Sequence, residues 1–303
     1  LGCVQAVRRK LAELRVDLVH GHGTERYGAL AAARSGQPNL ITIHGNLRVL
    51  AALRRARPFS YLWLSARLEA LALRRSNGVI CISTHTELGV QRLARRTWRV
   101  PNAVASEFFT VERLPARPPV VLCVADLVPH KNQLALLQHL TPLAEQRAFV
   151  LRLAGRAGPE PFAAEVKREV ACRPWAEYVG MLDRAQLRAQ LATAALLVLP
   201  SIEDNCPMAV LEAQAAGVPV VAARVGGVPD LVEPGVTGWL CEPDDSAGWR
   251  ERVARTLTNP IEANALAEAA RQRTRERSHP KLIADRHLKI YRELLEHSAG
   301  GSG

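Results

Sequence analysis

The sequence contains few aromatic residues and no hydrophobic run long enough to cross a membrane. Aromatic residues make up 5% of the 303 residues, and no apolar stretch approaches the roughly 20 residues that a transmembrane helix needs. No signal peptide is recognisable, although the sequence starts at Leu1 and not at methionine. A hydrophobic content of 48% with 23% charged residues is typical of globular domains. We therefore predict a globular, cytoplasmic protein.

The sequence also lacks closely spaced cysteines. Its six cysteines are scattered, and none forms the CxxC pair that is typical of zinc sites and redox motifs. Several lie in apolar, strand-like runs, where a free cysteine behaves as a small buried hydrophobe. We predict reduced thiols, as in the cytoplasm, and no metal site.

Acidic residues are scarce in the first third of the chain. Residues 1–114 hold 18 Lys and Arg against 7 Asp and Glu, whereas residues 115–303 hold 22 of each kind. The whole net charge of +11 therefore belongs to the first third. Such a field attracts nucleic acid, an anionic membrane or an acidic small substrate, and charge by itself does not choose among them.

Short β-branched runs alternate with longer amphipathic segments along most of the chain. The runs at 16–20, 39–44 and 78–83, with a weaker one at 98–100, predict four strands before the proline-rich segment 113–119. Six further strand-like runs follow, from VVLCVA to WLCEP, with helical segments between them. Continuous apolar strands separated by helices are typical of parallel sheets covered on both faces. We therefore predict an α/β protein with two Rossmann-like, doubly wound domains.

The predicted domains are an incomplete N-terminal domain at residues 1–114 and a C-terminal domain at 115–280. A doubly wound domain needs about five or six strands, and the first has four at most, so we expect further strands to precede Leu1. A helix at 281–297 is expected to pack back toward the first domain. The tail at 298–303, SAGGSG, has the composition of a disordered segment.

Ligands of open parallel sheets bind at the carboxyl ends of the strands, which draws attention to the loop after the strand ALLVLP. The stretch SIEDNCPMAVLEAQAAG places Asp204 just before a helix and Glu212 within it. Asn205 or Asp204 can cap that helix, and Pro207 fits its first turn. The helix N-terminus offers free amide groups to an anion. The spacing alone leaves two interpretations open: a ligand-binding pair of carboxylates, or only a helix cap and a surface charge.

The block VLPSIEDNCPMAVLEAQAAGVPVVAARVGGVPDLVEPGVTGWLCEPDD resembles the acid-x7-acid signature of the family 4 retaining glycosyltransferases, also called group 1. The segments VDLVHGHG, ITIHG, VPNAVASEFF and VADLVPHKNQLALL resemble segments of that family in the same order. The resemblance covers essentially the whole chain but enters partway through the family's first domain, as an N-terminally truncated member would. It implies the GT-B fold, in which two Rossmann-like domains face a cleft. It also implies transfer of a sugar from a nucleotide-sugar donor with retention of anomeric configuration.

The resemblance implies roles for particular residues. Asp204 matches the first acid of the signature, which meets the donor sugar, although Glu203 beside it competes for that role. Glu212 matches the second acid, which binds the ribose hydroxyls, and Lys131 matches a cation that meets the diphosphate. The place of a second family cation is occupied here by Asp126. The residues implied to line the rest of the donor site are Gly180, Met181, Asn205, Cys206, Pro207 and Met208.

His44 matches a histidine that lies near the donor sugar in the family, so the resemblance implies a catalytic role for it beside Asp204. His20 and His22 resemble the family's H-x-H pair, and a metal site there lacks a third ligand. Lys131 and the helix amides are implied to stabilise the leaving diphosphate without a metal or cofactor. No residue stands out as a nucleophile.

The segment 48–75 contains seven arginines and one glutamate, with Tyr61 and Trp63 among them. Such a segment can lie on an anionic membrane with its aromatic side chains at the interface; the alternative is a solvated helix face. Acceptors in the family include lipid-linked sugars at the cytoplasmic leaflet. The expected partners are therefore a nucleotide sugar, a glycan or lipid-linked acceptor, and the inner face of the membrane.

Other functions fit parts of the sequence less well. A catalytically impaired nucleotide-sugar-binding protein is suggested by Asp126 and by the incomplete first domain. A nucleic-acid-binding protein is suggested by the charge, but no recognition module is present, and we predict no nucleic-acid partner. A nicotinamide dehydrogenase is disfavoured because no strand leads into a GxGxxG turn.

Overall fold

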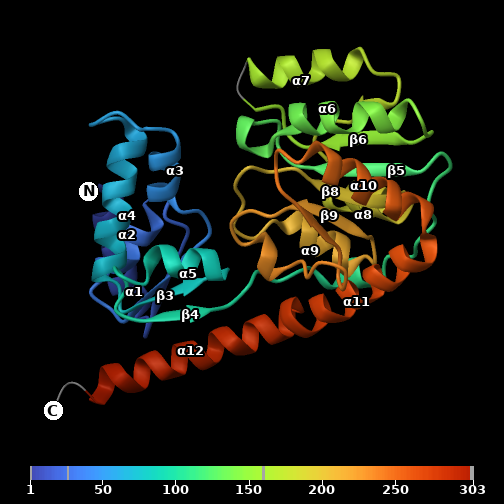
Figure 1. Cartoon of the computed structure of the whole chain (residues 1–303). Helices are drawn as coiled ribbons and strands as arrows, with labels where there is room; N and C mark the ends of the chain where they lie inside the picture. Colours follow the sequence, from blue (N-terminus) through green and yellow to red (C-terminus); the bar gives the residue numbers. More distant parts are fainter. Residues whose placement is uncertain (1, 26, 159–160, 301–303) are drawn as a thin grey trace. The chain divides into compact units, whose positions relative to one another are not determined.

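The computed structural model describes residues 2–25, 27–158 and 161–300. The chain forms two compact units, the first made of residues 1–102 with 281–303 and the second of residues 103–280. Each unit is built around a parallel β-sheet (Figure 1). No helix in the part of the chain that the structure describes is long and apolar enough to span a membrane.

The first unit contains a four-stranded sheet in the order β1-β2-β3-β4, with every pair parallel. The central strands β2 and β3 are buried along their whole length, as their continuous apolar sequences predict. All four strands expected from the sequence in this unit are present near their predicted positions. The strands are β1 (Val19–His22), β2 (Asn39–Ile43), β3 (Gly78–Cys81) and β4 (Thr97–Arg99).

Helices cover both faces of the first sheet. On one face, Ala29 of α2, Leu73 of α4 and Val90 of α5 share a core with Ile41 and Val79. On the other face, the side chains of Ile283, Ile290 and Leu294 from α12 pack against Leu40 and Ile80. The helices of this unit are α1 (Gly2–Leu14), α2 (Gly28–Ala33), α3 (Leu47–Leu53), α4 (Tyr61–Arg75), α5 (Thr84–Val90) and α12 (Pro280–Gly300).

Polar contacts also attach α12 to the first sheet. The Glu293 carboxylate accepts hydrogen bonds from Arg96 at 3.1 Å and from the Trp98 indole at 3.2 Å. The helix continues to Gly300, so residues 298–300 are helical and not disordered as the sequence suggested. Residues 301–303, the rest of that predicted tail, lie outside the described residues.

The second unit contains a six-stranded parallel sheet in the order β10-β9-β8-β5-β6-β7. The chain builds from β5 outward to β7, then returns to the other side of β5 with β8 and continues to β10. The strand order therefore reverses between β5 and β8, and such a topological switch point is where open α/β sheets bind ligands. The strands are β5 (Val120–Val124), β6 (Val150–Ala154), β7 (Ala176–Tyr178), β8 (Ala194–Leu199), β9 (Val220–Ala223) and β10 (Trp239–Cys241).

The second sheet is covered by two groups of helices. Side chains of α6, α7 and α10, among them Trp249 of α10, share one large core with alternate strand residues such as Val121 and Val198. α8 contacts β5, and α9 contacts β8, β9 and α11. The α-helices are α6 (Gln133–Ala144), α7 (Phe162–Ala171), α8 (Arg184–Thr193), α9 (Met208–Ala215), α10 (Ser246–Thr258) and α11 (Pro260–Ser278). The 3₁₀ segments are η1 (Ser106–Thr110), η2 (Pro129–Lys131) and η3 (Val228–Asp230).

The second unit begins at Ala103, upstream of the boundary that the sequence suggested after residue 114. The proline-rich segment 113–119 is bonded into this unit. The backbone amides of Leu114 and Ala116 donate to the carbonyls of Ala192 and Thr193 at 2.8 and 3.0 Å. These bonds hold the segment against the end of α8, and the Val104 amide, which donates to the Ser278 carbonyl at 2.9 Å, ties the preceding residues to the same unit.

Candidate functional site

Two oppositely charged side chains meet at the switch point of the second sheet. Lys131 ends η2, which follows β5, and Asp204 lies in the loop after β8. The Lys131 Nζ lies 2.5 Å from the Asp204 Oδ2, and the two side chains are only 20% and 11% exposed. The Ser201 hydroxyl donates to the same carboxylate oxygen at 3.3 Å. The structure thus brings together a cation and an acid that are 73 positions apart in sequence.

Backbone hydrogen bonds fix the loop that carries Asp204. The amide of Ile202 donates to the His130 carbonyl at 2.8 Å, and the amide of Gly227 donates to the Asp204 carbonyl at 2.9 Å. Gly226 has a φ of +51°, and a Cβ there would lie 2.1 Å from the Asp204 carbonyl oxygen. Only glycine fits this close approach, so the loop after β9 packs directly against the backbone of Asp204.

The start of α9 differs from the sequence prediction. Its N-cap is Pro207, and no side chain accepts a hydrogen bond from the first turn, so the prediction that Asn205 or Asp204 caps the helix is wrong. The physical reason is that the Asp204 carboxylate is engaged by Lys131 and Ser201. The neighbouring candidates Asn205, Cys206 and Pro207 are buried, whereas Met208 and Glu203 are half-buried.

Glu212 lies half-buried on α9, within the same loop-helix unit as Asp204. Burial raises the pKa of Glu212 to about 7, against the opposing effect of the positive charge of Arg184. A carboxylate with this pKa is only partly ionised near neutral pH. A ligand that donates hydroxyl hydrogen bonds to it would favour the ionised form.

A second ion pair lies in the loops after β5 and β6. Asp126 accepts hydrogen bonds from the Arg156 guanidinium at 2.8 Å and from the Arg156 backbone amide at 3.0 Å. Although burial acts in the opposite direction, these bonds and the charges of Arg156 and Lys131 hold the pKa of Asp126 below its usual range. The sequence analysis noted Asp126 as an acid where the family has a cation. It did not identify Arg156, which follows β6 between Gly155 and Gly158.

Gly180 and Met181 follow β7, the edge strand of the sheet. The Gly180 carbonyl accepts a hydrogen bond from the Gly155 amide at 2.8 Å, and Met181 is exposed. Both residues lie at a carboxyl end, as expected, but β6 separates their strand from β5, which precedes Lys131. Their predicted contact with a nucleotide base stays a prediction.

Histidines gather at the carboxyl end of β1 and β2 in the first unit. The His22 Nδ1 lies 3.5 Å from the His44 Nε2, and the rings of His20 and His22 are tilted against each other with centroids 4.2 Å apart. His20 bridges the sheet to α12, since its ring nitrogens lie 2.7 Å from the hydroxyls of Thr42 and Tyr291. The His287 ring lies beside His20 at 5.8 Å.

Burial disfavours the charged form of His20, His22 and His44. Burial, reinforced by the repulsion of His22, His287 and His44, lowers the pKa of His20 to about 3. Burial also lowers the pKa of His22 and of His44, with Glu25 acting in the opposite direction on His44. Neutral His44 offers one donor and one acceptor to a bound hydroxyl. Among the described residues, no group of three or more His, Cys, Asp or Glu side chains is arranged to hold a metal ion.

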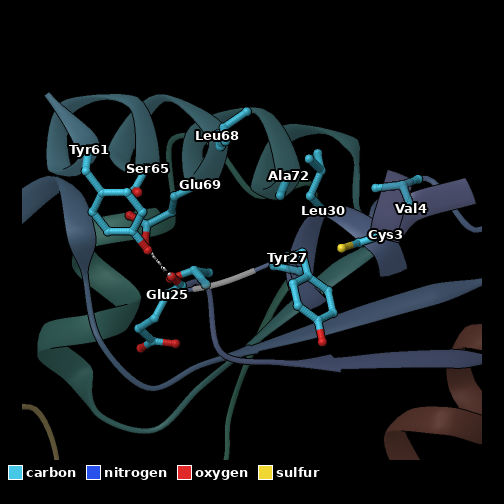
Figure 2. A pocket seen from close by; sticks show the side chains of 12 residues that line it. Cys3, Val4, Glu25, Tyr27, Leu30, Tyr61, Ser65, Leu68, Glu69 and Ala72 are labelled. Carbon is cyan, nitrogen blue, oxygen red and sulfur yellow. Dashed lines mark hydrogen bonds between the residues drawn. The ribbon is translucent and has the colours of Figure 1, made fainter. Parts of the chain in front are cut away.

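A pocket of about 420 Å³ opens beside this cluster in the first unit (Figure 2). The Glu25 carboxylate at its rim accepts a hydrogen bond from the Gly45 amide, next to His44, at 3.1 Å. The Tyr61 hydroxyl donates to the Glu25 carbonyl at 3.3 Å. The buried carboxylate of Glu69 receives hydrogen bonds from Thr24 and from the start of α3. The remaining lining residues are Cys3, Val4, Tyr27, Ala29, Leu30, Ser65, Leu68 and Ala72.

Comparison with known protein families matches both units. The profile of the "Glycosyl transferases group 1" matches residues 105–273, and that of "Glycosyltransferase Family 4" matches residues 1–108. The chain belongs to the group 1 glycosyltransferases. This confirms the family that the acid-x7-acid block suggested.

Relatives of this group 1 glycosyltransferase include two proteins of Mycobacterium tuberculosis. It is 28% identical to alpha-maltose-1-phosphate synthase over 307 residues, covering 91% of the chain and 79% of that protein. It is 37% identical to glycogen synthase over 123 residues, which cover 41% of the chain and 30% of that protein. The matched segment thus spans under a third of the length of the glycogen synthase.

Solved structures show that the group 1 glycosyltransferase has the predicted GT-B fold. Sucrose-phosphate synthase from Thermosynechococcus elongatus superposes with a TM-score of 0.84 at 23% identity, over 97% of this chain and 77% of that one. Anabaena HepE, solved in complex with UDP and glucose, superposes with a TM-score of 0.80 at 20% identity, over 95% and 80% of the two chains. At these identities the likeness establishes the fold.

Proposed function

We propose that this chain is a retaining glycosyltransferase that binds a nucleotide-diphosphate sugar on its second unit. The observation that carries the proposal is the Lys131–Asp204 pair at the switch point between β5 and β8. Lys131 binds the donor diphosphate, and the amide groups at the start of α9 face the same charge. Asp204, or Glu203 beside it, accepts hydroxyls of the donor sugar, and Glu212 accepts those of the ribose.

The reaction transfers the sugar without change of anomeric configuration. The bond between the anomeric carbon and the diphosphate oxygen breaks, and the acceptor hydroxyl oxygen bonds to that carbon on the same face. The hydroxyl proton passes to the departing phosphate oxygen. Lys131 stabilises the charge that develops on the leaving diphosphate. His44, whose pKa is lowered by burial, keeps the catalytic role that the family resemblance implies.

The pocket of the first unit is proposed to hold the acceptor. Glu25 connects its rim to the residue after His44, so an acceptor hydroxyl at this rim lies near the catalytic histidine. The lining combines aliphatic side chains with Tyr27 and Tyr61, which suits an acceptor with an apolar or ring-shaped portion. Glycan and lipid-linked precursors both satisfy this chemistry.

A basic, partly apolar surface beside the pocket is proposed to contact an anionic membrane. Phe59 and Tyr61 are 79% and 76% exposed at the start of α4. Arg54, Arg55 and Arg57 are exposed in the segment just before them. Sedimentation with vesicles containing phosphatidylglycerol tests this contact. A Phe59→Ala chain should bind the vesicles more weakly, whereas Leu88→Ala, which removes an exposed leucine of α5, should bind unchanged.

The donor site is tested by screening nucleotides and then following the product. In thermal denaturation with UDP, GDP, ADP and their sugar conjugates, the nucleotides of one base should raise the melting temperature of the chain. Proton NMR of the product formed from the matching α-linked donor sugar should show an α-anomeric coupling. Absence of stabilisation by every nucleotide diphosphate would contradict the proposal.

A further inference from the structure

We propose that Arg156 supplies the second positive charge for the donor diphosphate and that Asp126 positions its guanidinium. The inference rests on the proposed donor function of the second unit. Arg156 follows β6 and Lys131 follows β5, so the two cations rise from adjacent strands at the ligand-binding edge of the sheet. The proposed role of Arg156 is to bind the donor diphosphate and not to take part in the reaction at the sugar.

The backbone around Arg156 is built to a fixed geometry. The Leu127 amide donates to the Arg156 carbonyl at 2.8 Å, and the Gly158 amide donates to the Leu127 carbonyl at 3.2 Å. A Cβ at Gly155 would lie 2.1 Å from the Ala125 carbonyl oxygen, so the two loops touch through their backbones. The loop after β6 is thereby joined to the loop that leads to Lys131.

The Arg156 side chain keeps donors available for a ligand. Its guanidinium carries five N–H groups, and its NH2 nitrogen donates to the Asp126 carboxylate. The side chain is 70% exposed, and that of Asp126 is 40% exposed. The guanidinium therefore keeps its contact with Asp126 while its remaining N–H groups can donate to a phosphate.

The local charge balance gives a reason for this arrangement. The charge of Lys131 is balanced by Asp204. Without Arg156, the carboxylate of Asp126 would therefore give the loops after β5 and β6 a net negative charge. A diphosphate would then meet repulsion from Asp126. Arg156 cancels that charge, and its planar fork suits bidentate contact with phosphate oxygens.

The test compares ligands that differ only in phosphate. Calorimetric titration of UDP and of uridine, or of the base family found in the nucleotide screen, is done with the unaltered chain, Arg156→Ala, Arg156→Lys and Arg255→Ala. Arg255 of α10 is the matched control, because it also forms an ion pair at the surface, with Glu262 of α11. Melting curves verify that each variant is folded.

We expect Arg156→Ala to bind the diphosphate about tenfold more weakly while its affinity for the nucleoside stays unchanged. Arg156→Lys should retain most of the diphosphate affinity, and Arg255→Ala all of it. Equal diphosphate affinity in Arg156→Ala and the unaltered chain would overturn the inference while leaving the donor site in place. Failure of the unaltered chain to bind any nucleotide diphosphate would instead contradict the proposed function itself.

Discussion

The Nζ of Lys131 lies 2.5 Å from the carboxylate of Asp204, across the point where the strand order of the second sheet reverses. In the proposed donor complex, the diphosphate would compete with Asp204 for Lys131, and the sugar would compete with Lys131 for Asp204. The pair therefore holds both groups in place before the donor binds. The sequence placed the two residues in separate loops, and only the fold shows that they are partners.

Replacing each neighbouring acid separately identifies the one that meets the donor sugar. Asp204→Asn removes the charge that holds Lys131 but leaves the lysine free for phosphate, so nucleotide-diphosphate affinity should be unchanged or stronger. Turnover should fall by about 100-fold or more, because the transition state loses a charged contact. Glu203→Gln should keep most of the activity. Equal losses of kcat in the two variants would show that Asp204 has been given the wrong role.

Glu212 should make donor binding depend on pH near neutrality. With its pKa raised to about 7, the ionised fraction grows about tenfold between pH 6 and pH 8. Ribose hydroxyls donate to the ionised form, so nucleoside affinity should rise over this range. In Glu212→Gln the affinity should be weaker at pH 8 and flat with pH. An equally steep pH dependence in the variant would contradict the ribose assignment.

The same raised pKa has an opposite effect on folding. A carboxyl whose pKa is higher in the folded than in the unfolded state stabilises the fold below the unfolded value of 4.5, and that stabilisation is lost as pH rises through about 7. Above pH 7 the unliganded Glu212→Gln chain should therefore melt at a higher temperature than the unaltered chain. Nearly equal melting temperatures at about pH 4 and a clear gap at about pH 8 are the expected pattern.

The histidine cluster should make the fold sensitive to acid. Burial and neighbouring histidines lower the pKa of His20 from 6.5 to about 3, so the unfolded chain binds more protons between these values. The free energy of unfolding should fall as pH drops through this range, by up to about 1.4 kcal/mol per pH unit for this proton. His20→Gln should reduce the slope, and His297→Gln, which removes an exposed histidine, should not. An unchanged slope in His20→Gln would contradict the assignment.

Gly226 should tolerate no side chain. Its φ is +51° and an added Cβ would lie 2.1 Å from the Asp204 carbonyl oxygen, whereas Gly180, with a φ of +79°, has open space around the same position. Both alanine variants carry backbone strain, but only Gly226→Ala adds a clash, so it should cost at least about 2 kcal/mol more in urea unfolding. It should also reduce donor affinity. Equal costs at the two glycines would show that the loop relaxes freely.

Much of the fold could be predicted because its strands are short, apolar and separated by helices. The runs around Val79, Val121 and Val198 are buried strands, and Asp204 precedes α9 and Glu212 lies within it, as the sequence indicated. The helix cap was wrong because the Asp204 carboxylate is taken by a distant lysine. The extent of the second unit differed because the Val104 amide is bonded to Ser278 and the amides of Leu114 and Ala116 are bonded to the end of α8.

The contacts of the site could not be predicted, since they join residues far apart in sequence. The Asp126–Arg156 pair depends on two loops from adjacent strands meeting through their backbones. The link from His20 to Tyr291 spans 271 positions and depends on α12 covering the first sheet. Sequence spacing carries no information on such pairs, although the rule that ligands bind at the carboxyl ends of strands pointed to most of the loops involved.

The central claim is that Lys131 binds the diphosphate of a nucleotide donor at the switch point of the second sheet. The most direct measurement is a calorimetric titration of the nucleotide diphosphate and of its nucleoside into the unaltered chain and into Lys131→Ala. We predict that the variant loses about 10- to 100-fold in diphosphate affinity and nothing in nucleoside affinity. A Lys131→Ala chain that binds the diphosphate as tightly as the unaltered chain would contradict the account.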